Sequence, residues 1–228
     1  MVDVVMLEAE HRSPSERVYA LLRAEIMRGD VAPRSALRPQ ALADRCGVSL
    51  AVVRESLLRL VGEGLAERLP NRGFQVPAVD DERWQQLAAA RKLLEPPMLR
   101  LAIEHGDLEW EAAVRAALHR LEGTPLTDSD GSPHFSDAWS EAHRRFHRAL
   151  LAACGNPVLL EMSDRLWTAT ELARRWSVHR TPDRRFVDEH RALERAALQR
   201  DADAGQRLLA EHLGHTAAGL DRPAPAND

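Results

Sequence analysis

The sequence predicts a mainly α-helical protein in two parts: a small N-terminal domain of three helices and a two-stranded hairpin, and an all-helical bundle behind it. Apolar residues recur at helical spacing through most of the 228 residues. Two short runs typical of strands, residues 65–68 and 74–76, flank a turn that contains Pro and Gly. After a short linker at residues 77–81, the remaining segments follow the helical pattern. We place the domains at residues 12–77 and 80–220, and expect residues 221–228 to form a disordered tail.

The first helix carries its own start signal. Ser13-Pro14-Ser15-Glu16 is a capping box with Pro at the first helical position, so a helix should begin there and run to about Arg28. Gly29 ends it, because glycine readily adopts the left-handed conformation of a helix stop.

The next segment has the layout of a winged helix-turn-helix. A short helix from Pro39 to Cys46 is followed by Gly47, which suits a tight turn. Ser49 is the expected N-cap of a longer helix, from about Leu50 to Glu63. A helix held at a fixed angle by such a turn can enter the major groove of DNA, and the hairpin that follows can reach a phosphate or the minor groove. The inner face of this helix is expected to consist of Val53, Leu57, Leu60 and Val61.

The second domain reads as helices throughout, with a polar loop from Gly123 to Phe135. Such a sequence predicts a helical bundle with an apolar core. The expected helices span about 81–104, 107–122, 136–153, 157–177, 183–199 and 201–219.

The distribution of charge favours DNA contact through one domain. The whole chain has a net charge of −4, which alone argues against a nucleic-acid binder. Residues 12–77, however, hold eleven arginines and seven acidic residues, a net charge of +4. Residues 78–228 hold 20 Arg and Lys against 25 acidic residues, a net charge of −5. A basic N-terminal domain joined to an acidic second domain is the pattern expected when only the first domain binds DNA.

The sequence predicts a cytoplasmic protein with reduced thiols. It contains no window of about eighteen apolar residues, which a transmembrane helix requires. Its first ten residues hold three acidic residues and no Lys or Arg, where a signal peptide needs cations. Cys46 and Cys154 fall in different predicted domains, so we expect them to be separate thiols.

Five short motifs follow one another in residues 15–77. Their combination resembles the N-terminal domain of GntR-type bacterial transcription regulators. The resemblance implies that Arg54 contacts a base or phosphate, that Ser49 caps the recognition helix and contacts phosphate, and that Arg72 and Gly73 form the tip of the wing. A surface salt bridge is the alternative role for Arg54. The motifs are Gly47-Val48-Ser49, Val53-Arg54-Glu55, Arg59-Leu60, Glu63-Gly64-Leu65 and Asn71-Arg72-Gly73-Phe74.

Several positions depart from the pattern of that family. Gln40 and Leu50 stand where the family commonly has Arg, and Arg34 stands where a Gly usually follows Pro. Gln can pair with an adenine edge, and Leu can contact a thymine methyl group, so we include both with the neighbouring Ala51 among the DNA-facing residues. We expect either an operator unlike the usual one or weaker binding.

Histidines in the second domain raise the question of a metal site. His143 and His147 are four residues apart and project from one helical face, and His190 and His212 lie on two later helices. Imidazole is the commonest metal ligand among side chains, and facing helices of a bundle can supply such ligands. The alternative for the first pair is a solvated, Arg-rich helix face.

Residues 80–220 resemble the helical effector domain of the FadR branch, the FCD domain. The matching motifs are Arg91-Lys92-Leu93-Leu94-Glu95, Phe146-His147-Arg148-Ala149-Leu150, Gly155-Asn156-Pro157, Glu189-His190 and Glu211-His212-Leu213. Many members of that family hold a divalent metal through one Asp and three His. The resemblance implies His143, His147, His190 and His212 as ligands, with His143 in the place of the usual Asp. A neutral set of four imidazoles favours Zn²⁺ or Ni²⁺ over Mg²⁺ or Ca²⁺.

The resemblance also implies a function. Arg91 matches the first-helix Arg of the family and is the candidate to bind a small carboxylate effector, with an ion pair to Glu95 as its alternative. We therefore expect a homodimeric, non-enzymatic transcription regulator that binds operator DNA, most simply a repressor released by its effector. Two alternative interpretations remain: a metal-dependent enzyme built on a helical bundle, and a regulator that senses the metal directly.

Overall fold

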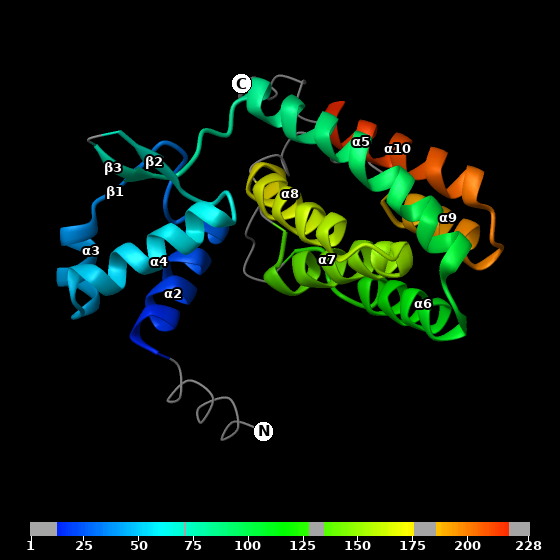
Figure 1. Cartoon of the computed structure of the whole chain (residues 1–228), viewed down its shortest axis with the longest axis horizontal. Coiled ribbons are helices and arrows are strands. Elements are labelled where there is room, and N and C mark those ends of the chain that lie inside the picture. Colours follow the sequence, from blue (N-terminus) through cyan, green and yellow to red (C-terminus); the bar gives the residue numbers. More distant parts are fainter. Residues whose placement is uncertain (1–12, 71, 128–134, 176–185, 219–228) are drawn as a thin grey trace. The chain divides into compact units, whose positions relative to one another are not determined.

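The computed structural model describes residues 13–70, 72–127, 135–175 and 186–218. The chain divides into two compact units, residues 1–79 and 80–228, which are described separately. The first is a helix-turn-helix with a small antiparallel sheet, and the second is a helical bundle, so the predicted fold class is confirmed (Figure 1). The predicted tail at residues 221–228 lies outside the described residues.

The first unit is built on three helices: α2 (Pro14–Arg28), α3 (Pro39–Cys46) and α4 (Leu50–Gly62). The predicted capping box is present, since the Ser13 side chain accepts from the Glu16 amide and the Glu16 carboxylate accepts from the Ser13 amide. Gly29 and Gly47 end their helices in the left-handed conformation. The facing sides of α2 and α4 bury the apolar residues Val18, Leu22, Ile26, Val53, Leu57 and Leu60.

The wing has three strands rather than two. β2 (Glu67–Leu69) and β3 (Gly73–Gln75) form the predicted hairpin, and β1 (Ala36–Leu37) pairs with the other edge of β3, all antiparallel. The sequence did not predict β1, because two residues are too few to show the alternation of a strand. Leu65 and Ala66, which were expected in a strand, instead lie buried just before β2.

Arg34 occupies a position that suits glycine. Its φ is +64°, in the left-handed region that non-glycine residues rarely adopt, and its amide donates to the Val76 carbonyl at 3.0 Å. The turn therefore keeps a glycine-like conformation although the residue is Arg.

The second unit is helical at nearly all of its described residues, and the predicted spans match closely. Pro96 and Pro97 lie inside its first helix without ending it. Predicted helical residues 176–177, 183–185 and 219, and loop residues 128–134, lie outside the described part. The helices are α5 (Asp81–His105), α6 (Leu108–Glu122), α7 (Asp137–Leu151), the 3-10 turn η1 (Ala152–Cys154), α8 (Pro157–Arg175), α9 (Phe186–Leu198) and α10 (Ala202–Ala218).

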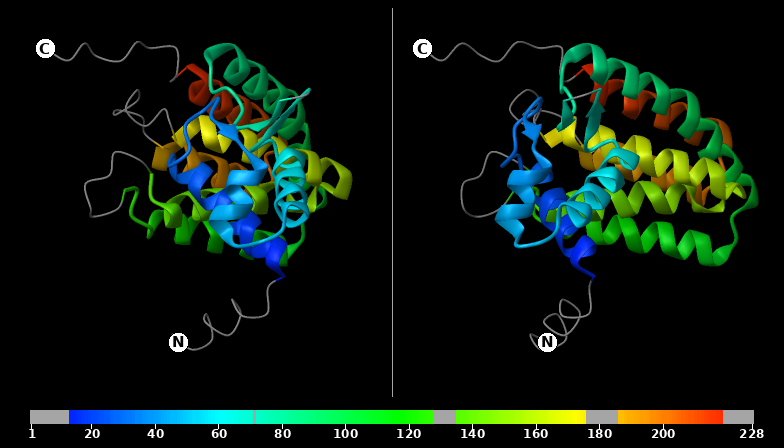
Figure 2. Two further views of the ribbon diagram at one scale, coloured as in Figure 1. Left: turned by 90° about the vertical axis from the view of Figure 1, so that its left-hand side faces the viewer. Right: turned by 60° about the vertical axis from the view of Figure 1, so that its left-hand side comes forward.

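The helices pack in neighbouring pairs around the apolar core of this unit. α5 packs against α8 and α10, and α6 packs against α7 and α9 (Figures 1 and 2). The turn between α5 and α6 requires a glycine, because a Cβ at Gly106 would lie 2.2 Å from the Trp110 ring. Cys154 is buried here and Cys46 lies in the first unit, so the two are free thiols, as predicted. Trp84, Trp110, Trp139 and Trp167 are all buried in the packing of this unit.

Candidate functional site

The N-terminal half of α4 carries the predicted recognition residues. Ser49 caps the helix by accepting from the Val52 amide at 3.4 Å. Arg54 and Ala51 are exposed, and Leu50 is half-buried. Arg54 forms no ion pair with any residue that the structure describes, so its alternative role as a surface salt bridge is not realised there. The exposed residues of this half-helix therefore offer one cation, Arg54, and one carboxylate, Glu55, beside the small side chain of Ala51.

The remaining predicted DNA contacts lie at the start of α3 and on the hairpin. Gln40 is exposed and donates to the Asp44 carboxylate at 3.0 Å, so its amide is partly engaged. Arg72 is exposed at the β2–β3 turn, and Gly73 has a φ of +89° that favours glycine. Asn71, at the same turn, lies outside the described residues.

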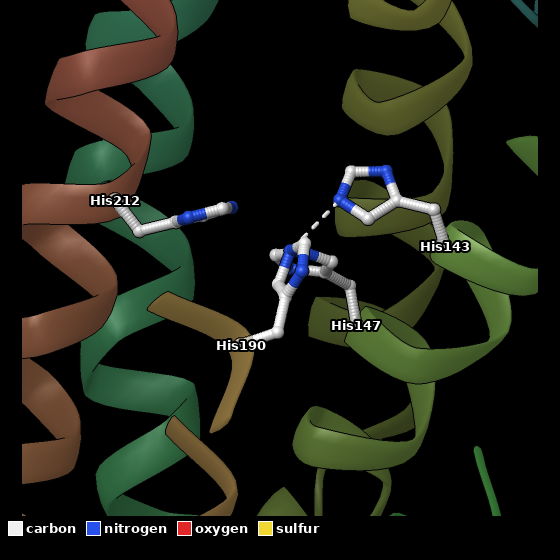
Figure 3. Close-up of side chains that lie close together, drawn as sticks. All are labelled: His143, His147, His190 and His212. Carbon is white, nitrogen blue, oxygen red and sulfur yellow. Dashed lines mark hydrogen bonds between the residues drawn. The ribbon is translucent and has the colours of Figure 1, made fainter. Parts of the chain in front are cut away.

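The four predicted histidines converge in the core of the second unit. His143 and His147 project from α7, His190 from α9 and His212 from α10, toward one another (Figure 3). Each is at most 5 % exposed, and one nitrogen of each lies within 4.8 Å of the corresponding nitrogens of the others. The alternative of a solvated helix face is therefore not realised for the pair on α7.

The two closest rings lie on different helices. The Nε2 atoms of His143 and His190 are 3.1 Å apart, which makes a hydrogen bond when one of the two carries its proton there. Aromatic rings wall the cluster: Trp139 stacks on His143 with ring centroids 4.6 Å apart, and Trp167 lies 5.0 Å from His147. The packing of buried aromatic rings therefore shapes the site.

A carboxylate behind the cluster orients one of its rings. Glu189 Oε2 lies 2.7 Å from His212 Nδ1, and Glu189 Oε1 lies 3.0 Å from His215 Nδ1. A carboxylate at Nδ1 holds the proton on that nitrogen, so that the Nε2 lone pair of His212 is the one directed to a ligand. His215, about one turn beyond His212, is largely exposed and contacts Glu189 rather than joining the four.

The donor set fits a borderline transition metal. Nitrogens bound to one Zn²⁺ at about 2.0–2.1 Å lie about 3.4 Å from one another in a tetrahedron. The observed nitrogen separations, from 3.1 Å up to 4.8 Å, need only small side-chain rotations to reach such an arrangement. Four neutral imidazoles supply no carboxylate oxygen of the kind that Mg²⁺ and Ca²⁺ prefer.

Arg91 lies beside the histidines but is held by an acid. Its Nε and Nη2 donate to the two Glu95 oxygens at 2.6 and 2.9 Å, and Nη1 donates to Thr170 Oγ1 at 3.3 Å. The ion pair that the i, i+4 spacing predicted is therefore present and buried. Arg91 also lines a cavity of about 20 Å³, which has room for about one water molecule. The cavity is further lined by Trp84, His143, His147, Trp167, Thr170, Glu171, His212, Leu213 and Thr216.

The other histidines stay apart from the cluster where the structure describes them. His105 and His119 are exposed on α5 and α6. His134 and His179 lie outside the described residues.

Comparison with known families accounts for both units. Residues 14–76 match the bacterial regulatory proteins of the gntR family, and residues 86–215 match the FCD domain. The chain belongs to the GntR family. Within it, the FCD match places the chain with regulators that carry a helical effector domain, so this GntR-family protein is a DNA-binding transcription regulator.

This GntR-family protein matches known transcription regulators over most of their length and most of its own. It is 36% identical to the HTH-type transcriptional regulator BphR of Paraburkholderia xenovorans, covering 90% of this chain and 84% of the relative. It is 33% identical to the HTH-type transcriptional repressor GlaR of Escherichia coli, covering 86% and 90%. Two solved structures share the fold. They are McbR/YncC of Escherichia coli (TM-score 0.70, 24% identity, 92% and 97% covered) and a GntR regulator of Rhodococcus sp. RHA1 (0.72, 22%, 92% and 98%).

Some site features of this GntR-family protein escaped the sequence reasoning. Glu171 and Thr170, buried on α8, line the cavity, and Glu189 is the carboxylate partner of a cluster histidine. In the sequence, Glu189 is marked only by its position next to His190, and this position does not show that its carboxylate contacts His212. Among the described helices, none combines the length and apolarity needed to cross a membrane.

Proposed function

We propose that this protein is a homodimeric, cytoplasmic repressor whose helical domain binds a small organic acid at a divalent metal held by His143, His147, His190 and His212. The observation that carries the proposal is the convergence of four buried imidazoles from three helices. Burying four imidazole rings together costs free energy unless their nitrogens are hydrogen-bonded to one another or bound to a ligand. When bound, Zn²⁺ or Ni²⁺ supplies a Lewis-acidic site for a carboxylate oxygen.

The residues around the metal position the ring nitrogens and exclude water. Glu189 fixes the tautomer of His212, and the two tryptophans close the site laterally. Arg91 contributes positive charge at the cavity wall and is the candidate to bind the effector carboxylate, for which it would exchange some of its hydrogen bonds to Glu95 and Thr170. The DNA-facing set in this proposal consists of Gln40, Ser49, Leu50, Ala51, Arg54, Arg72 and Gly73.

Metal analysis of the purified protein tests the central claim. We expect about one equivalent of Zn²⁺ or Ni²⁺ per chain, removed by chelation and reduced at least about tenfold in affinity by His147→Ala. The matched control is His119→Ala, because His119 is an exposed histidine on α6. Wild-type protein that takes up no divalent metal, or His147→Ala protein that binds as tightly as wild type, rejects the site.

A gel-shift experiment tests the DNA interface. Arg54→Ala should abolish the operator shift, while sedimentation shows an unchanged oligomer, because Arg54 is exposed and outside the core. Arg17→Ala serves as the control, since Arg17 is an exposed arginine of α2. Unchanged operator binding by Arg54→Ala would refute its role.

One observation favours a second candidate, a direct metal sensor. The cavity beside the histidines is only about 20 Å³, which suits an ion better than an organic acid. Titrating Zn²⁺ or Ni²⁺ against operator binding without any carboxylate separates the two. A full response to the metal alone supports the sensor, and a response that requires a carboxylate supports the first proposal. The known relatives are regulators, and we propose no catalytic role.

A further inference from the structure

A second cavity, here called the outer cavity, lies between α9 and α10 next to the histidine cluster. It has a volume of about 320 Å³, and its lining includes Asp188, Glu189, Glu211 and His215. His212 lines both this outer cavity and the inner cavity of about 20 Å³ described above. Its ring is therefore part of the wall that separates an exposed cavity from the interior of the bundle.

The two nitrogens of the His212 ring face different surroundings. Nδ1 lies 2.7 Å from one oxygen of Glu189, and the other oxygen of this carboxylate lies 3.0 Å from Nδ1 of His215. Figure 3 shows the same His212 ring reaching from α10 toward the rings of His147 and His190. Exposure rises along this row, since the side chains of His212, Glu189 and His215 are 4%, 24% and 62% exposed. The three side chains thus place nitrogen and oxygen ligands in a row from solvent to the cluster.

The charge of the outer cavity favours cations. Asp188 and Glu211 are exposed and Glu189 is half-buried, so three carboxylates line the cavity, and none of its lining residues in the described part of the chain is Arg or Lys. Arg207 Nε lies 4.0 Å from Glu211, at the outer limit of an ion pair, and both side chains are more than half exposed. A concave surface lined by carboxylates raises the local concentration of cations and speeds their association.

The volumes of the two cavities indicate where a hydrated ion can enter. About six water molecules at about 30 Å³ each need about 180 Å³, which the outer cavity can hold and the inner cavity of about 20 Å³ cannot. The lining of the inner cavity also includes the guanidinium of Arg91, whose positive charge opposes an approaching cation, beside the carboxylate of Glu171. The outer cavity is therefore the better entrance.

We propose that the outer cavity is the entrance through which a divalent cation reaches the four histidines. This inference rests on the proposed metal site and adds the path by which that site fills. Asp188 and Glu211 attract the hydrated ion, and Glu189 and His215 replace some of its water, since carboxylate and imidazole are both ligands of Zn²⁺. A cation on Glu189 competes with His212 Nδ1 for the carboxylate, which frees the His212 ring to rotate and open the wall.

An entrance affects rates rather than the equilibrium. Side chains that contact the ion only during passage lower the barrier in both directions, so their removal slows uptake and release by the same factor. The dissociation constant, which is the ratio of the two rates, then stays unchanged. Side chains that hold the bound ion change the release rate and the dissociation constant instead.

Stopped-flow kinetics on the full chain measure both rates. Metal-free protein mixed with Zn²⁺ and a fluorescent zinc indicator gives uptake, and zinc-loaded protein mixed with excess EDTA gives release. Asp188→Asn combined with Glu211→Gln should slow both at least about threefold at low salt, and the difference from wild type should shrink at high salt. The matched control combines Glu104→Gln with Glu109→Gln, which removes the same charge from exposed side chains of α5 and α6, and should keep the rates of wild type.

Obstructing the outer cavity gives a second test that leaves its charge unchanged. Ala192 is half-buried on α9 and lines the cavity, so Ala192→Phe should slow uptake and release at least about threefold while the dissociation constant stays within about threefold of wild type. The control is Ala113→Phe, at an exposed position of α6. Far-UV circular dichroism checks folding, and the charge variants decide the question if Ala192→Phe does not fold.

The outcomes separate this inference from the proposed function. A wild-type chain that takes up no divalent metal removes the proposed metal site, and its entrance with it. If the wild type binds Zn²⁺ and the entrance variants match their controls in both rates, the ion enters elsewhere and only this inference is overturned. Entrance variants that release Zn²⁺ faster than wild type also overturn it, because their native side chains would then hold the bound ion rather than admit it.

Discussion

Breaking the buried ion pair on α5 should reveal whether Arg91 is primarily a structural residue. The side chains of Arg91 and Glu95 are 7% and 1% exposed, and two hydrogen bonds of 2.6 and 2.9 Å join them. Arg91→Met leaves the Glu95 carboxylate buried with only the Ser163 hydroxyl at 3.3 Å as a described partner. Removing one member of a buried pair costs about 3–5 kcal/mol of unfolding free energy, so we expect a loss of that size.

Urea denaturation followed by circular dichroism measures this loss. Arg91→Met combined with Glu95→Leu should recover most of it, because no uncompensated charge then remains buried. The control is Arg145→Met, which breaks the i, i+4 pair with Glu141, 64% and 51% exposed, and should cost less than about 1 kcal/mol. A loss below about 1 kcal/mol for Arg91→Met would refute the reasoning, and would mean that Arg91 can leave Glu95 cheaply to bind an effector.

Three further substitutions test separate features. Glu189→Gln should lower metal affinity about 10–100-fold in a chelator competition, because it removes the carboxylate that holds the His212 ring. The control Glu211→Gln changes an exposed side chain and should leave metal affinity unchanged, and equal metal affinities of the two variants would contradict this. Arg34→Gly should raise the unfolding free energy by about 0.5–1 kcal/mol in thermal melts by relieving a φ of +64°, and a lower melting temperature would contradict it. Burial and the hydrogen bond to Glu63 raise the pKa of Tyr19 above its ordinary value of 10.0. The neutral phenol therefore stabilises the folded protein fully below about pH 10, and this stabilisation is lost as the pH rises through the pKa of the folded state. The difference in melting temperature between wild type and Tyr19→Phe should shrink at alkaline pH, and a constant difference would contradict this.

Local patterns in the sequence predicted what depends on neighbouring residues. The capping box at Ser13, the stop at Gly47 and the pair Arg91–Glu95 all involve residues within four positions of one another, and all are present in the structure. Strand β1 could not be predicted in the same way, because its two residues gain their partner only when β3 returns to pair with them.

The histidine cluster shows how far sequence reasoning reached at the site. Spacing alone placed His143 and His147 on one face of α7, but the arrival of His190 and His212 came from the family resemblance, since three helices must pack before these rings meet. The part of Glu189 depends on the direction of α9 against α10, and the size of the cavity depends on every side chain that fills it. Such properties belong to packing and have no local signature.

The size of the inner cavity limits how an effector can act. Trp167 and Thr170 of α8 line it together with three of the four histidines. A cavity of about 20 Å³ cannot accept an organic acid unless a wall moves, and close-packed helices move as units. Linkage requires reciprocity: the factor by which the metal changes effector affinity must equal the factor by which the effector changes metal affinity. Effector affinity measured with and without Zn²⁺ should therefore change by the same factor as Zn²⁺ affinity measured with and without effector, whereas an effector affinity that does not depend on the metal would show that the acid does not bind at the histidines.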